Sequence, residues 1–298
     1  MKMYDIPIIN LVTTIRKVAK KVYGKKARLG SRGRHGTPIY ARIATLAYLV
    51  LNRRTPERLA KELEKNRALL KSLGLPWPVK ARTINEWRRR LGKLIERLIR
   101  KTFEVIARWR GRLRSKAIVD TTGFKRGRAS SHYEMRIGRK RKLYAKVIAV
   151  YSAEVDAVYT VGVDYDTMHD VRMAEGILPA VCDSGLFDGL VGDKGFDSSD
   201  LMESVKRCGL VPYIAVRGGK LEPRGGIRLE SKRNFEALVA GCGNIRGLVE
   251  SLFSSIKACT GDVVYSRRLE GFAAEIAVRF LAYNVGVIIK LEIPTTKL

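Results

Sequence analysis

The stretch that decides the fold is Asn244-Ile-Arg-Gly-Leu-Val-Glu-Ser-Leu-Phe-Ser-Ser-Ile-Lys257. Its apolar residues recur at helical spacing, which predicts an amphipathic helix whose apolar stripe packs on a core. That stripe consists of Val249, Leu252 and Ile256. At 100° per residue, Arg246, Glu250 and Lys257 fall within about 40° of one another on a neighbouring edge. One acid flanked by two bases at the rim of a packed helix suits a metal-bound phosphodiester with cations on either side.

Two further carboxylates end strand-like runs upstream. Asp120 ends the run Lys-Ala-Ile-Val-Asp, and Asp193 ends the run Leu-Val-Gly-Asp. Together with Glu250 they provide three carboxylates, and an oxygen-only donor set favours magnesium or manganese. We therefore predict that Asp120, Asp193 and Glu250 are catalytic and bind metal. Each has a structural alternative, because an aspartate before Thr-Thr-Gly or Lys-Gly often forms a turn, and Glu250 is spaced to pair with Arg246.

The same residues carry a resemblance to a known family. The motifs concerned are Asp120 in Val-Asp-Thr-Thr-Gly, Asp193 in Gly-Asp-Lys-Gly-Phe-Asp-Ser, and Arg246-x3-Glu250-x6-Lys257. In this order they resemble the DDE transposases of prokaryotic insertion sequences, of the insertion-sequence-four/five type, over about residues 116–290. One position departs from the pattern, because that group usually has a tyrosine three residues before the arginine and this chain has Gly243.

The resemblance implies both a fold and an activity. It implies a ribonuclease-H-like domain that cuts and joins DNA strands at the ends of a mobile element. It also implies two divalent cations, Mg²⁺ or Mn²⁺, with Asp120 bridging both, Asp193 on one and Glu250 on the other. The implied partners are double-stranded DNA, as terminal inverted repeats and as target, and a homodimer or larger synaptic complex assembled on that DNA.

From residue 116 onward the pattern of the sequence itself predicts an α/β domain. The expected strands lie at 116–120, 143–153, 158–164, 190–193 and 211–216. The expected helices lie at 170–182, 199–208, 244–257 and 271–290. A turn between the second and third strands predicts an antiparallel meander, and the later strands alternate with helices. This is the element order of a ribonuclease-H-like fold with a mixed sheet flanked by helices.

The first 115 residues predict an all-α region instead. Thr55 followed by proline starts one helix, and the capping box Thr83-Ile-Asn-Glu86 predicts a long helix that ends near Arg110. The cations expected to be exposed on these helices are Arg88, Arg89, Arg90, Lys93, Arg97 and Arg100. We therefore expect a helical DNA-binding domain at 1–115 and a catalytic domain at 116–298.

Charge divides the chain in the same way. Of its 58 Lys and Arg and 29 Asp and Glu, residues 1–115 hold 31 and 7, whereas residues 116–298 hold 27 and 22. The first part is therefore expected to bind a polyanion, DNA or RNA. A membrane partner is disfavoured, because no lipidation motif is present and the apolar tract at 272–291 contains Glu275 and Arg279. With no secretory signal at the N-terminus, a cytoplasmic, nucleoid-associated protein is expected.

Two insertions are expected in the catalytic domain, a basic loop at 124–146 and a polar one at about 218–240. The basic loop would contact the DNA backbone beside the metal site; its alternative is a solvated loop without a fixed partner. The predicted DNA contacts are Arg246, Lys257, Arg139, Lys140, Lys142 and Lys146.

Other polar residues have structural predictions. The four cysteines lack the spacing of a zinc site and are expected to be buried and reduced. Asp170 and Asp197 are each expected to cap the helix that follows.

Two other functions remain open at this point. A ribonuclease-H-like, structure-specific nuclease would cut DNA without joining strands, and a catalytically inactive or domesticated copy would only bind DNA.

Overall fold

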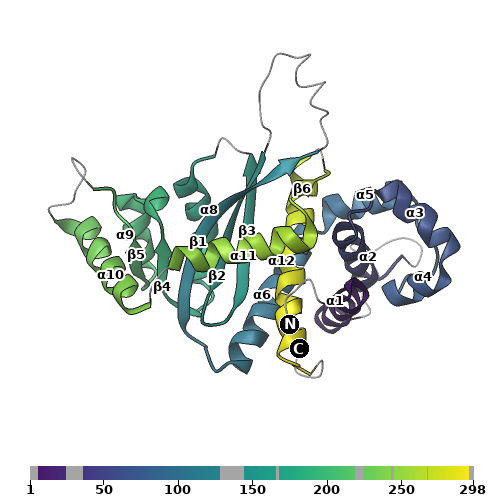
Figure 1. The fold of residues 1–298 in the computed structure, drawn as a ribbon, viewed down its shortest axis with the longest axis horizontal. Coiled ribbons are helices and arrows are strands. Elements are labelled where there is room, and N and C mark those ends of the chain that lie inside the picture. Colours follow the sequence, from purple (N-terminus) through teal and green to yellow (C-terminus); the bar gives the residue numbers. More distant parts are fainter. Residues whose placement is uncertain are drawn as a thin grey trace, which may run out of the picture.

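A mixed sheet forms the centre of the protein (Figure 1). The computed structural model describes residues 6–24, 36–127, 144–165, 168–218, 225–242, 245–266 and 268–294. Within these residues the sheet has the order β3-β2-β1-β4-β5, and β6 pairs with β1. The strands are β1 (Ser115–Arg126), β2 (Tyr144–Ser152), β3 (Ala157–Tyr165), β4 (Phe187–Gly192), β5 (Val211–Ile214) and β6 (Val263–Val264).

The strand pairing confirms the predicted meander. β1, β2 and β3 pair antiparallel, whereas β4 and β6 run parallel to β1, and β5 runs parallel to β4. β1 is longer than the sequence pattern indicated: it pairs with β2 as far as Lys125 and with β6 as far as Arg126. The expected strand end at Asp120 is therefore wrong, because the chain stays extended for another six residues.

Helices cover both faces of the sheet. α8 (Asp170–Cys182) lies on the face that contains Ile148 and Gly162, because a side chain at Gly162 would meet both Ile148 and Ile177 of α8. α11 (Ile245–Thr260) crosses β1 on the opposite face (Figure 1), where Lys257 reaches Thr122. The predicted apolar stripe of α11 is confirmed, because Val249, Leu252 and Ile256 are all buried.

The N-terminal third is helical as predicted. Its helices are α1 (Ile8–Tyr23), α2 (Ile39–Leu51), α3 (Pro56–Lys65), α4 (Arg67–Leu73), α5 (Ala81–Arg90) and α6 (Gly92–Trp109). α6 packs on β3 and on α12 (Leu269–Lys290) rather than among the other N-terminal helices. Helix α6 therefore packs with the α/β part of the protein. The division of the chain into two domains at residue 115 stays a prediction.

The predicted long helix from Thr83 to Arg110 is wrong. Helix α5 begins at Ala81 and ends before Leu91, and α6 starts at Gly92. The break buries the Leu91 side chain completely. Thr83 lies inside α5 and does not cap it, so tertiary packing overrides the local capping-box pattern.

The long apolar helix α12 is the central helix of the fold. It contacts α1, α2, α5, α6, β3 and α11. By length and composition it is the one described helix that could cross a membrane, but 83% of that window is buried inside the protein, as predicted for a core helix. Asn284 of α12 also closes the edge of β3, since its amide accepts from Val158 N at 2.8 Å and donates to Val158 O at 2.7 Å.

The polar stretch expected as an insertion is largely helical. Helix α10 (Gly226–Cys242) packs on β5, where the Ser231 hydroxyl bonds both Ile214 N and Ile214 O. Residues 219–224 lie outside the described part. The stretch thus covers the far edge of the sheet.

Asp197 does not cap the helix that follows it, contrary to the prediction. Ser198 caps α9 (Ser199–Arg207) by accepting from Leu201 N at 3.4 Å. The Asp197 carboxylate is instead held by Arg228 of α10 at 2.7 Å and 3.0 Å. Burial alone would raise the pKa of Asp197, but the hydrogen bonds from Arg228 and from Arg217 N together lower it.

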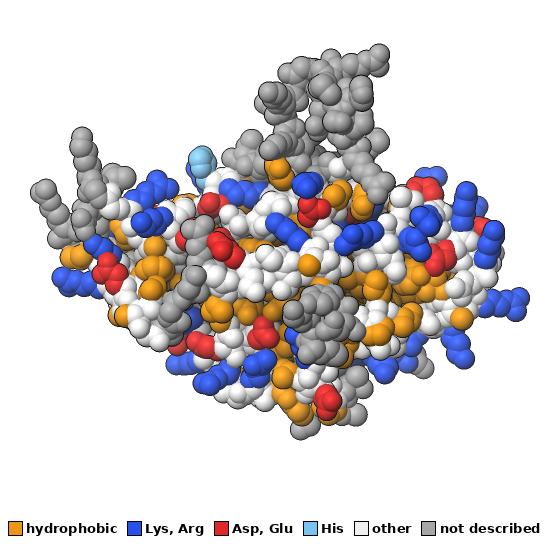
Figure 2. All heavy atoms as spheres, viewed as in Figure 1, with side chains coloured by type: hydrophobic (Ala, Val, Ile, Leu, Met, Phe, Trp, Pro, Cys, Tyr) orange, Lys and Arg blue, Asp and Glu red, His pale blue; other side chains and the backbone are white. Residues whose placement is uncertain are grey.

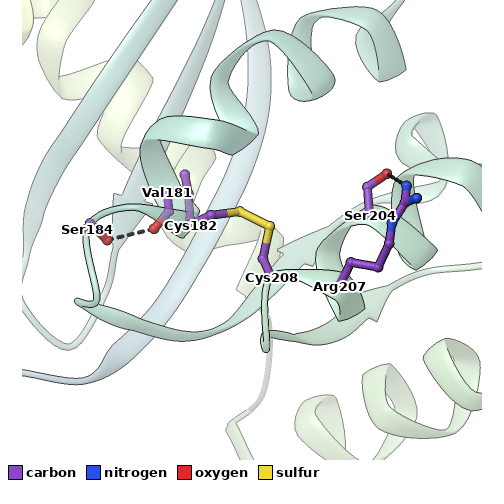
Figure 3. Close-up of a disulfide and its surroundings, with 6 residues drawn as sticks. All are labelled: Val181, Cys182, Ser184, Ser204, Arg207 and Cys208. Atoms are coloured by element: carbon purple, nitrogen blue, oxygen red, sulfur yellow. Dashed lines mark hydrogen bonds between the residues drawn. A yellow bond between two sulfur atoms is a disulfide. The ribbon is translucent and has the colours of Figure 1, made fainter.

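The expectation of reduced cysteines is wrong for two of the four. Cys182 at the end of α8 and Cys208 after α9 form a disulfide that joins the two helix ends (Figure 3). The disulfide could not be predicted from the sequence, because the two cysteines are far apart in the chain and only the packing of α8 against α9 brings their thiols together. Cys259 on α11 is half-buried.

Reducing this disulfide should destabilise the protein. The bond closes a loop of 26 residues, for which the chain-entropy model gives about 3 kcal/mol and a melting temperature lower by roughly 5–10 °C. Thermal unfolding with and without reductant measures the difference. The double substitution Cys182→Ser with Cys208→Ser should melt at the lower temperature and lose its response to reductant. Equal thiol titres in denatured protein before and after reduction would contradict the assignment.

Candidate active site

Two of the three predicted carboxylates lie at one edge of the sheet. β1 and β4 are parallel neighbours, with Ala117 beside Leu190 and Ile118 beside Val191. Continuing this register by two residues places Asp120 beside Asp193, whose backbone is still extended. Directly paired residues of parallel strands share a face, so both aspartates lie on the same side of the sheet. That side is the α11 face, because Thr122, two residues after Asp120, contacts Lys257.

Each aspartate is held by a backbone N–H directly downstream. Thr121 N donates to Asp120 Oδ1 at 2.7 Å, and Gly195 N donates to Asp193 Oδ1 at 2.7 Å. Asp193 starts a 3-10 turn, η2 (Lys194–Phe196), so the predicted turn role is correct for it. Both carboxylates are half-buried. A structural role in the turn does not exclude a catalytic role. A carboxylate has two oxygen atoms, and the backbone N–H bond uses only one of them.

The third carboxylate, Glu250, belongs to α11, and its side chain is exposed. Glu250 and Lys257 are seven residues apart, so they point in nearly the same direction two turns along the helix. Lys257 Nζ donates to Thr122 Oγ1 at 2.6 Å, which fixes this side of α11 over the strand that carries Asp120. Among the described residues, no group of three or more Asp, Glu, His or Cys side chains lies close enough to hold a metal ion. The recorded pairing of β1 with β4 ends at Ile118 and Val191, so the proximity of Asp120 and Asp193 follows from extending that register, and a cluster of all three carboxylates stays a prediction.

The C-terminal end of α11 is anchored by a buried arginine. Arg279 of α12 donates to Thr260 O and Gly261 O at 2.6 Å each, and to Val263 O at 2.6 Å. Its guanidinium lies 5.6 Å from the centroid of Phe124, two residues beyond Thr122 on β1. Burial lowers the pKa of Arg279 to about 10, which leaves it protonated at neutral pH. Arg279 therefore connects the end of α11 to the strand below it.

The same network reaches the N-terminal helices. Glu275, one turn before Arg279, accepts from Arg88 at 2.7 Å and from Tyr265 N at 2.9 Å. Burial raises the pKa of Glu275, and the charge of Arg88 opposes this. Arg88 was predicted to be exposed, but only 12% of its side chain is accessible. The prediction was wrong because α12 places a buried acid opposite it.

With this geometry established, the comparison with known families is informative. A family model described as the transposase DDE domain matches residues 111–285, more than half of the chain. The chain belongs to the DDE transposase family. Among curated proteins, none matches this transposase-family chain significantly. The matched range includes Asp120, Asp193 and Glu250, so the resemblance predicted from these motifs is confirmed at the level of the family.

The predicted DNA contacts of this transposase-family protein have different surroundings. Lys257 is half-buried, and burial lowers the pKa of its amine. Lys146 Nζ pairs with Asp170 at 2.7 Å and donates to Met168 O at 2.7 Å. The side chain of Arg246, Gly243, and the loop residues Arg139, Lys140 and Lys142 lie outside the described part, so these predictions remain as they were.

Basic side chains cover the helical part of the transposase-family chain, as Figure 2 shows at its right-hand end. The exposed cations of α3, α4, α5 and their connections are Arg58, Lys61, Lys65, Arg67, Lys71, Lys80, Arg82, Arg89 and Arg90. They greatly outnumber the exposed acids of the same segment, Glu57 and Glu64. This distribution matches the charge division predicted from the sequence.

Proposed function

We propose that the protein is a DNA transposase that cuts and joins strands at the ends of a mobile element of the insertion-sequence-four/five type. The observation that supports the proposal is the parallel register of β1 and β4, which, extended by two residues beyond Ile118 and Val191, would bring Asp120 beside Asp193 on the α11 face in a chain of the DDE transposase family. The order β3-β2-β1-β4-β5, with three antiparallel strands followed by parallel ones, supports a ribonuclease-H-like domain.

The donor set fits divalent cations. Asp120, Asp193 and Glu250 offer only carboxylate oxygens, which suit Mg²⁺ or Mn²⁺. Two such ions, when bound, would activate the attacking oxygen and stabilise the leaving one. Glu250 is carried on α11, which Lys257 holds against β1, so its carboxylate would reach the ions from the helix and the aspartates from the sheet.

The other residues bind and orient the DNA. The exposed cations of α3 to α5 would neutralise phosphates of the terminal repeat, which fixes its position without reading its sequence. Lys257 is placed next to the strand of Asp120 and would contribute its positive charge near the cut phosphodiester. We further propose that a homodimer or larger assembly holds two element ends, and that the protein works in the cytoplasm on nucleoid DNA.

A strand-joining experiment tests this function. A labelled duplex that contains the inverted repeat bordering the gene is incubated with the protein, Mg²⁺ and a supercoiled target plasmid. Wild-type protein should nick the duplex next to the repeat and produce labelled, joined plasmid, and a chelator should abolish both products. Glu250→Gln should bind the duplex with unchanged affinity but form at least about 10³-fold less of both products, since one metal ligand is lost.

The two alternatives give different products. A structure-specific nuclease would nick the duplex and yield no joined plasmid. A binding-only protein would shift the duplex in a gel without nicking it in any divalent metal, and this result would overturn the proposed activity. Gly243 is the reason to test for a binding-only protein, because the family pattern usually has tyrosine at this position.

A further inference from the structure

Asp170 is a fourth carboxylate beside the predicted catalytic edge. It is the first residue of α8, and no side-chain hydrogen bond caps this helix, contrary to the prediction that Asp170 does so. Its Oδ1 instead accepts from Thr121 Oγ1 at 2.9 Å and pairs with Lys146 Nζ at 2.7 Å. The helix that carries Asp170 lies on the sheet face opposite α11. Asp170 therefore reaches Thr121 on β1 from the α8 face of the sheet.

The second oxygen of Asp170 lies at the turn of Asp193. A Cβ atom added at Gly195 would lie 2.9 Å from Asp193 Oδ1 and 3.1 Å from Asp170 Oδ2. Only glycine fits between these two oxygens without displacing one of them. The carboxylates of Asp170 and Asp193 thus flank the same backbone position.

These contacts follow one pattern. Thr121 donates its N–H to Asp120 and its hydroxyl to Asp170. Gly195 donates its N–H to Asp193, and a Cβ atom at Gly195 would lie 3.1 Å from Asp170 Oδ2. The residue that orients each predicted catalytic aspartate therefore lies next to the same third carboxylate.

Lys146 compensates the negative charge of Asp170 beside the two predicted catalytic aspartates. A third negative charge next to two carboxylates would repel them, but the Lys146 ammonium lies 2.7 Å from Asp170. Lys146 also donates to Met168 O, two residues before Asp170, so it connects the segment just before α8 to the start of β2. One lysine thus both compensates the charge of Asp170 and fixes its backbone.

We propose that Asp170 is a positioning residue for the catalytic edge, which sets the orientation of Asp120 through Thr121 and of Asp193 through Gly195. The proposal rests on the proposed function, in which these aspartates bind the metal ions. Asp170 itself is not a ligand in this scheme, because it belongs to α8 on the sheet face opposite α11 and its charge is paired with Lys146. Carboxylate partners of ligand-orienting groups typically change metal affinity or activity by about 10- to 100-fold when removed.

The substitutions Asp170→Asn and Thr121→Val test the two ends of this contact. Asp170→Asn removes the charge and keeps the size, whereas Thr121→Val keeps the branched shape and removes the hydroxyl. Both should raise the Mg²⁺ concentration needed for half-maximal nicking, and the dissociation constant for Mn²⁺ measured by electron paramagnetic resonance, by about 10- to 100-fold. Binding of the labelled repeat duplex should stay within about twofold of wild type.

Two matched controls separate positioning from general damage. Thr121→Ser retains the hydroxyl and should keep near wild-type metal affinity, whereas Glu175→Gln alters an exposed carboxylate on the same helix and should have no effect. If Asp170→Asn and Thr121→Val match Glu175→Gln in nicking and in Mn²⁺ affinity, the proposal is wrong while the proposed function stands.

A third measurement needs no catalytic activity. In metal-free protein, hydrogen exchange of the Thr121 and Gly195 amides should be about tenfold faster in Asp170→Asn than in wild type, because their orienting contact is weakened. Unchanged exchange at both amides would overturn the positioning role, whatever the activity of the wild type. Absent nicking by wild type with accelerated exchange in the variant would overturn the proposed function alone.

Discussion

The substitution Asp193→Asn should reduce DNA nicking by at least about 10³-fold, because a neutral amide binds a divalent cation far more weakly than a carboxylate. The side chain keeps its size, and its remaining oxygen can still accept from Gly195 N, so the turn after β4 should persist. Asp120→Asn should have the same effect, because Asp120 is the other aspartate proposed to bind the metal ions. Nicking of the labelled repeat duplex at saturating Mg²⁺ measures the loss.

The matched control is Asp188→Asn. Asp188 lies on the same strand, near its amino end, where its carboxylate is 46% exposed and 3.7 Å from Lys116. Exposed pairs of this kind contribute little to stability, so Asp188→Asn should retain wild-type nicking and melting temperature. A full-activity Asp193→Asn variant would exclude Asp193 from the metal site and with it the pairing on which the proposed function depends.

The second large effect is expected for stability. Arg279→Met should lower the free energy of unfolding by about 3–5 kcal/mol, because it leaves several buried carbonyls after α11 without their donor. It also removes one of the two cations near the buried Glu275. Thermal unfolding should show a melting temperature lower by roughly 5–10 °C. Arg279→Lys should be intermediate, since one ammonium cannot reach all the carbonyls.

Arg108→Met is the surface control for this prediction. Arg108 is 64% exposed and lies 3.8 Å from Glu104, so its replacement should leave the melting temperature nearly unchanged. The Arg279 variant should also lose nicking at temperatures well below its melting point, because Arg279 holds the end of the helix that carries Glu250. An Arg279→Met protein as stable as wild type would mean that water satisfies these carbonyls, and the anchor role would be wrong.

Much of the fold was predictable because periodicity is a local property. The positions of β2 and β3, the apolar stripe of α11, and the limits of α8 at residues 170–182 all agree with the structure. Local signals failed where a distant partner competes with them. The helix expected from Thr83 to Arg110 breaks at Leu91, whose side chain is completely buried, and the Asp197 carboxylate pairs with Arg228, 31 residues further along the chain.

Part of the candidate site was also predictable from the sequence, and part was not. Residue type and order in the chain were sufficient to select Asp120, Asp193 and Glu250, and to predict the family that the match over 111–285 confirms. The contacts of Asp170 could not be predicted, since its partners Thr121 and Lys146 lie on β1 and β2, far from it in the sequence. The one signal in the sequence was that Asp170 lies at the start of a predicted helix. An aspartate at this position is usually explained as a helix cap.

The sequence by itself determined the composition of this protein's parts: a strongly basic helical segment, an α/β segment, and three acids in the order of a transposase. Only the tertiary structure decided which of those side chains meet. The parallel register of β1 and β4 brings the two strand segments that lead to Asp120 and Asp193 side by side, and the packing of α8 joins Cys182 to Cys208. The physical reason is that periodicity and charge act between near neighbours in the chain, whereas register and helix packing depend on contacts between residues far apart in it.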